Sequence, residues 1–303
     1  MKTLNFPVLI DGGLSNVLEE QGCDLNHPLW SAKLIHEHPD QIIDVHYKYL
    51  LAGAQIITTA SYQASIPGYL AQGFDQKSAE AAISRSVGLA EEAILRAKSS
   101  GHIDYDPLIA GSIGPYGAYL ADGSEYRGNY GVSQKDLIAF HKDRLTLLNR
   151  SNAHILACET IPSLQETKVL SKLLQATTKP SWISFSCKNE SQINDGSTIE
   201  EAVEVIAHNS NVFAVGINCT APQHVSGLIK RIKSCTSTKK VIVYPNSGEA
   251  YNSTTKTWIG LSEPDQFVQM AREWKFLGAD LIGGCCRIGP AHIRNMCDTW
   301  HYH

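Results

Sequence analysis

The sequence ILACETIPSLQETKVLSKLL, residues 155–174, shows the pattern on which the fold depends. Its first five residues form a short, mostly apolar run, as expected of a strand in a parallel sheet that is covered on both faces. Ser163 then precedes Glu166 by three residues, which is the spacing of a capping box at the start of a helix. The stretch therefore predicts one β-strand, residues 155–159, followed by one α-helix.

The same unit recurs along the chain. Seven further apolar runs predict strands at residues 8–11, 55–59, 108–112, 182–186, 214–219, 241–245 and 280–284. The segments between them have helical patterns, and in one of them apolar residues recur at helical spacing, at Ile83, Val87, Ala90 and Ile94. Three more capping-box pairs stand ahead of predicted helices: Ser133 with Asp136, Ser197 with Glu200 and Ser262 with Asp265.

Strands that alternate with helices predict parallel pairing through right-handed crossovers. Eight such units favour a closed (β/α)8 barrel, or TIM barrel, which is an α/β fold. A doubly wound open sheet is the alternative, but the first predicted strand leads into Asp11-Gly12-Gly13 and lacks the G-x-G-x-x-G dinucleotide turn. No change in composition marks a linker, so we predict a single domain over residues 1–303. The long third connection, residues 116–131, is a candidate functional loop.

Composition and charge limit the classes of partner. The chain has 303 residues, of which 43% are hydrophobic, and 26 basic against 30 acidic side chains give a net charge of -4. These values are typical of a globular protein and do not favour a nucleic acid partner. No apolar stretch approaches about 18 residues, so we expect no membrane span and no membrane partner. Without an export signal at residues 1–11, we expect a cytoplasmic protein whose eight cysteines are reduced thiols or metal ligands.

Barrel enzymes carry their chemistry at the C-terminal ends of the strands. The polar residues at these positions are Asp11, Thr58, Thr59, Glu159, Thr160, Asn218, Cys219, Cys285 and Cys286. Three thiolates from separate strand ends favour a zinc site that keeps one position open for water or substrate. Two glycines, Gly283 and Gly284, would let the chain bend so that both of the following thiols reach one metal. We interpret Cys158, Cys187 and Cys235 as structural.

The two carboxylates at this edge, Asp11 and Glu159, favour a substrate with an ammonium group, with capping or turn formation as the alternative role. Besides thiol chemistry, two other functions fit such a zinc site. One is a metal-dependent hydrolase or lyase in which the open position binds water, although a site of three thiolates is electron-rich and a poor Lewis acid. The other is a non-catalytic barrel in which zinc only joins the sixth predicted strand to the eighth.

Four motifs, taken together and in this order, resemble the homocysteine S-methyltransferase family over essentially the whole chain. They are Leu9-Ile10-Asp11-Gly12-Gly13, Ala157-Cys158-Glu159-Thr160-Ile161-Pro162, Gly216-Ile217-Asn218-Cys219 and Gly283-Gly284-Cys285-Cys286-Arg287. The resemblance implies a (β/α)8 barrel that uses Zn²⁺ to methylate a thiol, with Cys219, Cys285 and Cys286 as the metal ligands. It also implies that Asp11, Thr59 and Glu159 bind the amino acid homocysteine, and we place Asn218 with them. No catalytic residue is expected beyond the metal-activated thiolate of the substrate.

Two further segments, residues 111–128 and 244–249, resemble the branch of this family that takes its methyl group from a sulfonium donor. The implied donors are S-methylmethionine or S-adenosylmethionine, and the implied product is methionine. The chain departs from this branch before Pro290, where Ile288 and Gly289 replace two hydroxyl residues that the branch commonly has. We also expect tyrosines of the third connection to hold the cationic donor, with simple loop packing as the alternative. These are Tyr116, Tyr119 and Tyr126.

Overall fold

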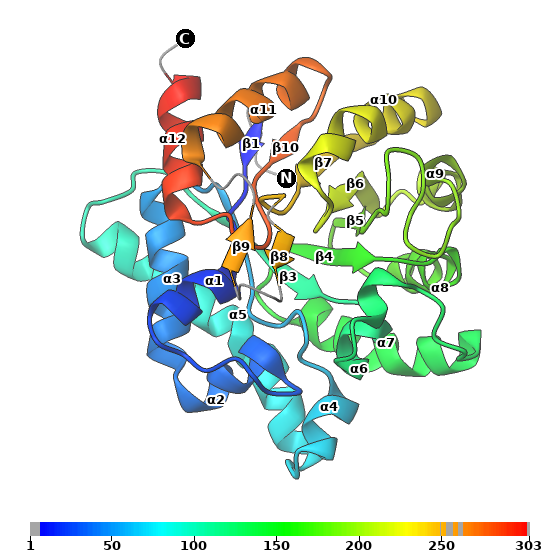
Figure 1. The fold of residues 1–303 in the computed structure, drawn as a ribbon. Coiled ribbons are helices and arrows are strands. Elements are labelled where there is room, and N and C mark those ends of the chain that lie inside the picture. Colours follow the sequence, from blue (N-terminus) through cyan, green and yellow to red (C-terminus); the bar gives the residue numbers. More distant parts are fainter. Residues whose placement is uncertain (1–6, 249, 253–256, 260–262, 302–303) are drawn as a thin grey trace.

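Eight parallel strands form a barrel with helices around it (Figure 1). The computed structural model describes residues 7–248, 250–252, 257–259 and 263–301. The barrel strands are β1 (Val8–Leu9), β2 (Ile56–Thr58), β3 (Leu108–Ile113), β4 (Ile155–Ile161), β5 (Ser181–Phe185), β6 (Val212–Asn218), β7 (Lys240–Tyr244) and β10 (Leu281–Ile282). Each overlaps one of the eight predicted strands, so the predicted (β/α)8 barrel is confirmed.

The barrel closes between its first two strands. Hydrogen-bonded neighbours follow the order β1, β10, β7, β6, β5, β4, β3, β2. At the remaining junction, Ile10 forms an isolated parallel bridge with Ile56, and the backbone N–H of Asp11 donates to the Ile56 carbonyl at 3.0 Å. The backbone N–H of Gln55 also donates to the Leu9 carbonyl at 2.8 Å. The alternative of an open, doubly wound sheet is therefore wrong.

The helices lie outside the strands (Figure 1). They are α1 (Leu14–Glu20), α2 (Leu34–Glu37), α3 (Pro39–Leu51), α4 (Ile66–Ala71), α5 (Gln76–Ser99), α6 (Tyr116–Leu120), α7 (Gln134–Arg150), α8 (Leu164–Leu174), α9 (Ile199–Ala207), α10 (Val225–Cys235), α11 (Pro264–Phe276) and α12 (Pro290–His301). Short 3-10 helices occur at η1 (Trp30–Lys33), η2 (Ser124–Tyr126) and η3 (Pro222–His224). On α5, Ile83, Val87 and Ala90 are buried, as the helical spacing predicts. Within the described ranges, the helices are all too short or too polar to span a bilayer.

The predicted capping boxes hold only in part. Ser133 and Asp136 form a complete box at the start of α7. Ser163 caps α8 by accepting a hydrogen bond from the backbone of Glu166, whose carboxylate points elsewhere. The box at α9 lies one residue later than predicted, since Thr198 and not Ser197 is the cap.

Two connections differ from the sequence prediction. Beyond β7, an antiparallel pair of strands, β8 (Ala250–Asn252) and β9 (Thr257–Ile259), was not expected. The third connection contains the short helices α6 and η2 where a long loop was predicted. Two residues of the sequence predictions lie outside the described residues. They are Ser262, of the predicted capping box with Asp265, and Glu249, of the segment 244–249. A single domain over all of residues 1–303 stays a prediction, because residues 1–6 and 302–303 also lie outside them.

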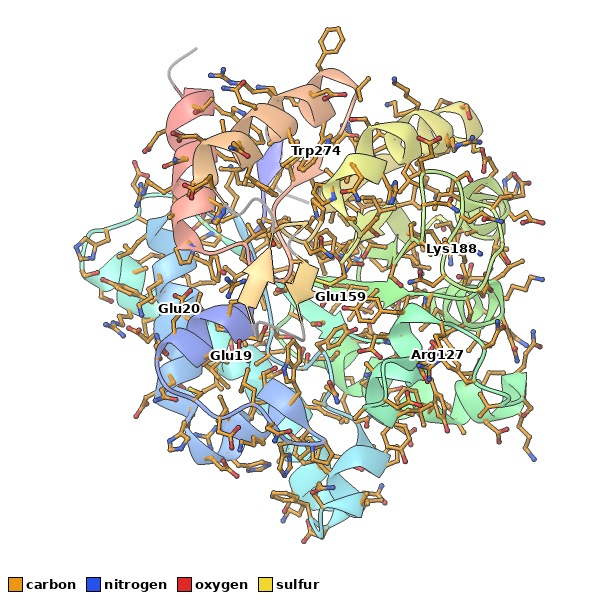
Figure 2. All side chains as sticks on the ribbon, in the orientation of Figure 1. Glu19, Glu20, Arg127, Glu159, Lys188 and Trp274 are labelled. Atoms are coloured by element: carbon orange, nitrogen blue, oxygen red, sulfur yellow. A yellow bond between two sulfur atoms is a disulfide. The ribbon has the colours of Figure 1, made fainter. Side chains whose placement is uncertain are left out.

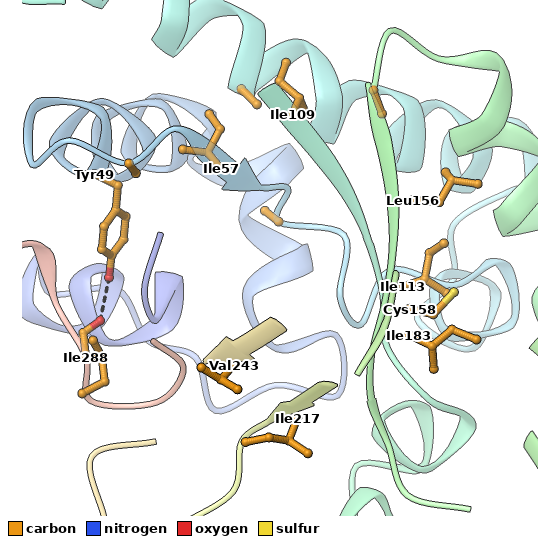
Figure 3. Close-up of a cluster of buried hydrophobic side chains, with 14 of the residues drawn as sticks. Tyr49, Ile57, Ile109, Ile113, Leu156, Cys158, Ile183, Ile217, Val243 and Ile288 are labelled. Atoms are coloured by element: carbon orange, nitrogen blue, oxygen red, sulfur yellow. Dashed lines mark hydrogen bonds between the residues drawn. The ribbon is translucent and has the colours of Figure 1, made fainter. Parts of the chain in front are cut away.

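Side chains on the strands alternate between two cores, one inside the barrel and one between strands and helices. Figure 3 shows part of the outer core, which includes Ile57, Ile109, Leu156, Cys158, Ile183, Ile217 and Val243. On β4, Ile155 and Ala157 belong to the inner core, whereas Leu156 and Cys158 belong to the outer one. The next residue, Glu159, is thereby turned to the inside of the barrel at the C-terminal end of the strand.

Candidate active site

A cavity of about 590 Å³ lies at the C-terminal ends of the barrel strands. Its lining includes all seven residues that the sequence predicts for the site, namely Asp11, Thr59, Glu159, Asn218, Cys219, Cys285 and Cys286. Figure 2 shows Glu159 near the middle of the molecule, where the strands converge. The fold thus brings together side chains that lie far apart in the sequence, although their roles in binding stay predictions.

Three cysteines gather at the ends of β6 and β10. The Sγ atoms of Cys219, Cys285 and Cys286 all lie within 4.8 Å of one another, and among the described residues they form the one group able to hold a metal ion. Cys219 and Cys285 form a disulfide in this structure, and the Sγ atoms of Cys285 and Cys286 are 4.0 Å apart. The Cα atoms of this pair lie 5.6 Å apart, within disulfide range, so the pair is not reduced in this structure, whereas its role as metal ligands stays a prediction.

The backbone around these cysteines is closely packed. Cys219 has a φ of 44°, in the left-handed region that few residues other than glycine adopt. The backbone N–H of Cys285 donates to the Pro245 carbonyl at 2.8 Å, which ties the end of β10 to the end of β7. A Cβ atom on Gly283 would lie only 2.5 Å from the Asp11 carbonyl oxygen. Gly283 is therefore needed for close contact between β10 and the segment after β1.

The two predicted carboxylates are buried and partly hydrogen-bonded. Asp11 accepts a hydrogen bond from the backbone of Thr58 at 2.7 Å and another from its hydroxyl at 3.1 Å. Glu159 accepts hydrogen bonds from the hydroxyls of Ser112 and Tyr244. Burial raises the pKa of Glu159 to about 7, and burial together with the charge of Glu159 raises the pKa of Asp11 well above its usual value. Two such carboxylates on one cavity wall are suited to binding a cation.

Thr59 and Asn218 line the cavity, but their polar groups already have protein partners. The Thr59 hydroxyl accepts a hydrogen bond from the backbone of Ser112 at 3.0 Å and lies 2.7 Å from the Ser61 hydroxyl. The Asn218 amide accepts from the backbone of Thr160 and donates to its hydroxyl, both at 2.7 Å. These bonds hold Thr160 at a left-handed φ of 60°. Direct contact of Thr59 or Asn218 with a substrate stays a prediction.

The tyrosines of the third connection divide into two groups. Tyr126 lines the cavity. Tyr116 and Tyr119 are not part of its described lining and pack against Phe140, with ring centroids 5.0 and 5.4 Å away. For Tyr116 and Tyr119 the structure therefore favours the alternative of loop packing.

Several cavity residues were not identified from the sequence. Ser112 and Tyr244 lie on the inner face of their strands, two residues after the inward-facing Ala110 and Ile242. Because residues two apart on a strand face the same side, the sequence could have indicated that both side chains point into the barrel. Trp30, Tyr62 and Glu125 also line the cavity, but they come from connections whose course no local pattern predicts.

Comparisons with known proteins agree with this geometry. The sequence profile of the family described as homocysteine S-methyltransferase matches residues 8–300. Homocysteine S-methyltransferase YbgG of Bacillus subtilis (strain 168) is 44% identical over 293 residues, which cover 95% of this chain and 93% of the relative. The metallated form of the homocysteine methyltransferase MmuM from Escherichia coli has a TM-score of 0.88 at 38% identity, covering 97% of this chain and 96% of that one. The oxidized form of MmuM also has a TM-score of 0.88, at 39% identity and with 96% and 95% coverage.

Proposed function

Because the chain belongs to the homocysteine S-methyltransferase family and is a methyltransferase, we propose that it transfers a methyl group from a sulfonium donor to homocysteine, giving methionine. The observation that supports this proposal most is the composition of the cavity. Three cysteine sulfurs gather there beside the carboxylates of Asp11, Glu125 and Glu159, and the described lining contains no Lys or Arg. A thiol-binding metal site in a cavity lined by carboxyl groups and without Lys or Arg in its described lining suits two substrates that both carry a positively charged group.

Zinc is the metal that we propose for the three cysteines. Thiolates are soft ligands that select zinc, and three protein ligands leave one position for a substrate. When bound, zinc would lower the pKa of the homocysteine thiol so that it reacts as a thiolate. Because only thiolates bind the ion, the disulfide between Cys219 and Cys285 must be reduced before the site can fill.

Asp11 and Glu159 are proposed to hold the ammonium group of homocysteine. Both side chains are more than 90% buried, and burial disfavours their charged forms. An ammonium group would supply the missing positive partner and so favour ionisation of both carboxylates. Thr59 and Asn218 fix the backbone of the same wall and thereby keep the substrate oriented.

The sulfonium donor is proposed on the grounds of charge and chemistry. An anionic donor would meet three carboxylates in the cavity, whereas a sulfonium is attracted to them. The substrate sulfur forms a bond to the methyl carbon, and the bond from that carbon to the donor sulfur breaks. The electron pair stays on the donor sulfur, which leaves as a neutral thioether, and the thiol proton goes to solvent. Holding both sulfurs in line across the methyl group supplies about 7 to 11 kcal/mol of the acceleration.

The test is a direct assay on the reduced, zinc-loaded chain. Homocysteine labelled in its carbon chain is mixed with S-methylmethionine or S-adenosylmethionine, and mass spectrometry measures labelled methionine. We expect labelled methionine from at least one donor and none after a chelator removes the metal. Cobalt substitution gives a second readout, since homocysteine should shift the thiolate-to-cobalt absorption. Absence of labelled methionine with both donors would overturn the proposal. The cytoplasmic location expected from the sequence stays a prediction.

A further inference from the structure

Glu125 has a carboxylate for which the proposed function names no specific contact with a substrate. It lies in η2 of the third connection and lines the cavity. Its Oε2 atom is buried and has no hydrogen-bond partner within the described structure. A buried polar atom without a partner costs free energy, and a charged one costs more. Because Glu125 is part of the cavity lining, its carboxylate is placed to meet a ligand that brings a positive charge.

The nearest candidate partner in sequence is engaged elsewhere. Arg127 donates hydrogen bonds to the side chains of Asp122, at 3.1 Å, and Ser124, at 2.8 Å. Figure 2 shows Arg127 farther from the middle of the barrel than Glu159. Burial raises the pKa of Glu125, whereas a hydrogen bond from its own backbone N–H lowers it, and the charges of Asp122 and Arg127 have smaller, opposite effects. The ion pair with Asp122 therefore leaves Glu125 open to another cation.

The protein holds Glu125 in a defined place. The Ser186 hydroxyl donates to the Glu125 backbone carbonyl at 3.0 Å. A Cβ atom on Gly117 would lie only 2.5 Å from the Glu125 backbone nitrogen, so α6 packs tightly against η2. Tyr126, the next residue, lines the same cavity and adds an aromatic ring to its wall. An anchored carboxylate and an aromatic ring in one cavity wall are suited to an organic cation.

The cavity contains two carboxylate sites that come from different parts of the fold. Asp11 and Glu159 lie at the ends of barrel strands, whereas Glu125 lies in η2 of the third connection. We propose that Glu125 is the specificity-determining residue for the methyl donor and that its carboxylate contacts the positively charged sulfonium end of that molecule. This inference rests on the proposed function, to which it adds a separate site for each substrate.

The charge change during the reaction predicts which kinetic parameter, KM or kcat, depends on Glu125. The donor sulfur is positive before transfer and neutral afterwards, so its attraction to Glu125 weakens toward the transition state. An interaction that is strongest in the ground state lowers the donor KM without raising kcat. Loss of the Glu125 charge is therefore expected to raise the donor KM about 10-fold or more while kcat stays the same or rises. The KM for homocysteine should stay unchanged.

The experiment compares Glu125→Gln with Asp143→Asn. Both variants remove one negative charge, but Asp143 lies on α7, is exposed and is outside the described cavity lining. Calorimetry on the reduced, metal-free protein measures binding of S-methylmethionine and of methionine, which share the amino acid group but differ in charge at sulfur. We expect Glu125→Gln to weaken binding of S-methylmethionine about 10-fold and that of methionine hardly at all. Asp143→Asn should leave both affinities within about twofold, because exposed charges are screened.

Each outcome separates this inference from the proposed function. Equal losses for both ligands would mean that Glu125 only shapes the connection, and unchanged binding would mean that it contacts neither ligand. Either result overturns the inference, even if the wild-type protein makes methionine. Charge-selective binding in a protein that transfers no methyl group would instead uphold the cation site and overturn the proposed function.

Discussion

Two buried carboxylates near β4, Glu159 and Glu166, meet different surroundings. Glu159 faces the cavity, where two hydroxyls donate to it and burial raises its pKa to about 7. Glu166 lies in the first turn of α8 and is fully buried outside the barrel. It is not part of the described cavity lining. The two side chains are seven residues apart in sequence, but Glu159 lines the cavity and Glu166 lies in the closed interior.

Glu166 is satisfied by the protein itself. Its carboxylate accepts hydrogen bonds from His141 at 2.7 Å, from the backbone of Tyr116 at 2.7 Å and from the Tyr130 hydroxyl at 2.9 Å. Arg144 lies 2.9 Å from the other ring nitrogen of His141 and can only donate, so His141 is a neutral bridge between Arg144 and Glu166. A carboxylate with this many internal partners stabilises the fold, whereas one that faces a cavity is available to a ligand.

Breaking the proposed metal site should produce the largest effect on the cavity side. Cys286→Ser removes one proposed zinc ligand and is expected to reduce methyl transfer by more than the roughly 10- to 100-fold that loss of an outer partner costs. Its free energy of unfolding should stay close to that of the wild type, because the core does not depend on the metal. Cys158→Ala is the control, since Cys158 is buried outside the barrel beside Glu159. It should keep its activity and lose about 1 kcal/mol of stability. Near-normal turnover by Cys286→Ser would exclude it as a ligand.

In the closed interior around Glu166, Glu166→Gln should lower the free energy of unfolding by about 3 to 5 kcal/mol. The reason is that Arg144 then remains buried without a negative charge in its hydrogen-bond network. Glu159→Gln is the matched substitution on the cavity side. It should leave the free energy of unfolding unchanged or higher at pH 7, because ionisation of the buried Glu159 opposes folding. Urea denaturation of both variants measures the difference. Equal losses would show that the two carboxylates do not differ as described.

The smallest effect concerns homocysteine binding by Glu159→Gln. Loss of a charged hydrogen bond costs about 1.5 to 3 kcal/mol, so the KM for homocysteine should rise roughly 10- to 150-fold. In the wild type, Glu159 must give up its proton to bind an ammonium group. The KM for homocysteine should therefore fall as pH rises through about 7 and then level off. Steady-state kinetics between pH 6 and pH 8 test this. If Glu159→Gln keeps the same step, another group is responsible for it.

The raised pKa of Glu159 has a matching consequence for stability. The folded protein keeps a proton on Glu159 that the unfolded chain loses near the usual value of 4.5. The contribution of Glu159 to stability is therefore full at lower pH and declines as pH rises from about 4.5 to about 7. The melting temperature of Glu159→Gln should rise relative to the wild type over this interval. A constant difference would contradict the raised pKa.

The barrel and the convergence of the three cysteines were predictable because their signals are local. Each barrel strand is a short apolar run, and the cysteines directly follow such runs at Asn218 and Gly284. The alternation on β4 also placed Cys158 and Glu159 on opposite faces. Strand ends at the same edge of a parallel barrel must converge, so their neighbours in space follow from the fold class.

The residues that were missed depend on contacts between distant segments. Ser163 and Glu166 fit a capping box, but the Glu166 carboxylate bonds to His141, 25 residues away. At α9, Thr198 with Glu201 has the same spacing as the predicted pair, so the local pattern could not select between them. Glu125 follows no strand, and only the packing of the third connection turns it toward the cavity.

Asp11 accepts hydrogen bonds from Thr58 at the junction where the barrel closes, and the same carboxylate lines the cavity. Redesign of the enzyme for another thiol acceptor is therefore constrained at this position. A substitution chosen to fit a new acceptor would also remove the bonds that join the first strand to the second. The cavity-facing residues of the third connection lie outside this junction between strands. Libraries that vary them can therefore alter ligand preference while the barrel stays closed.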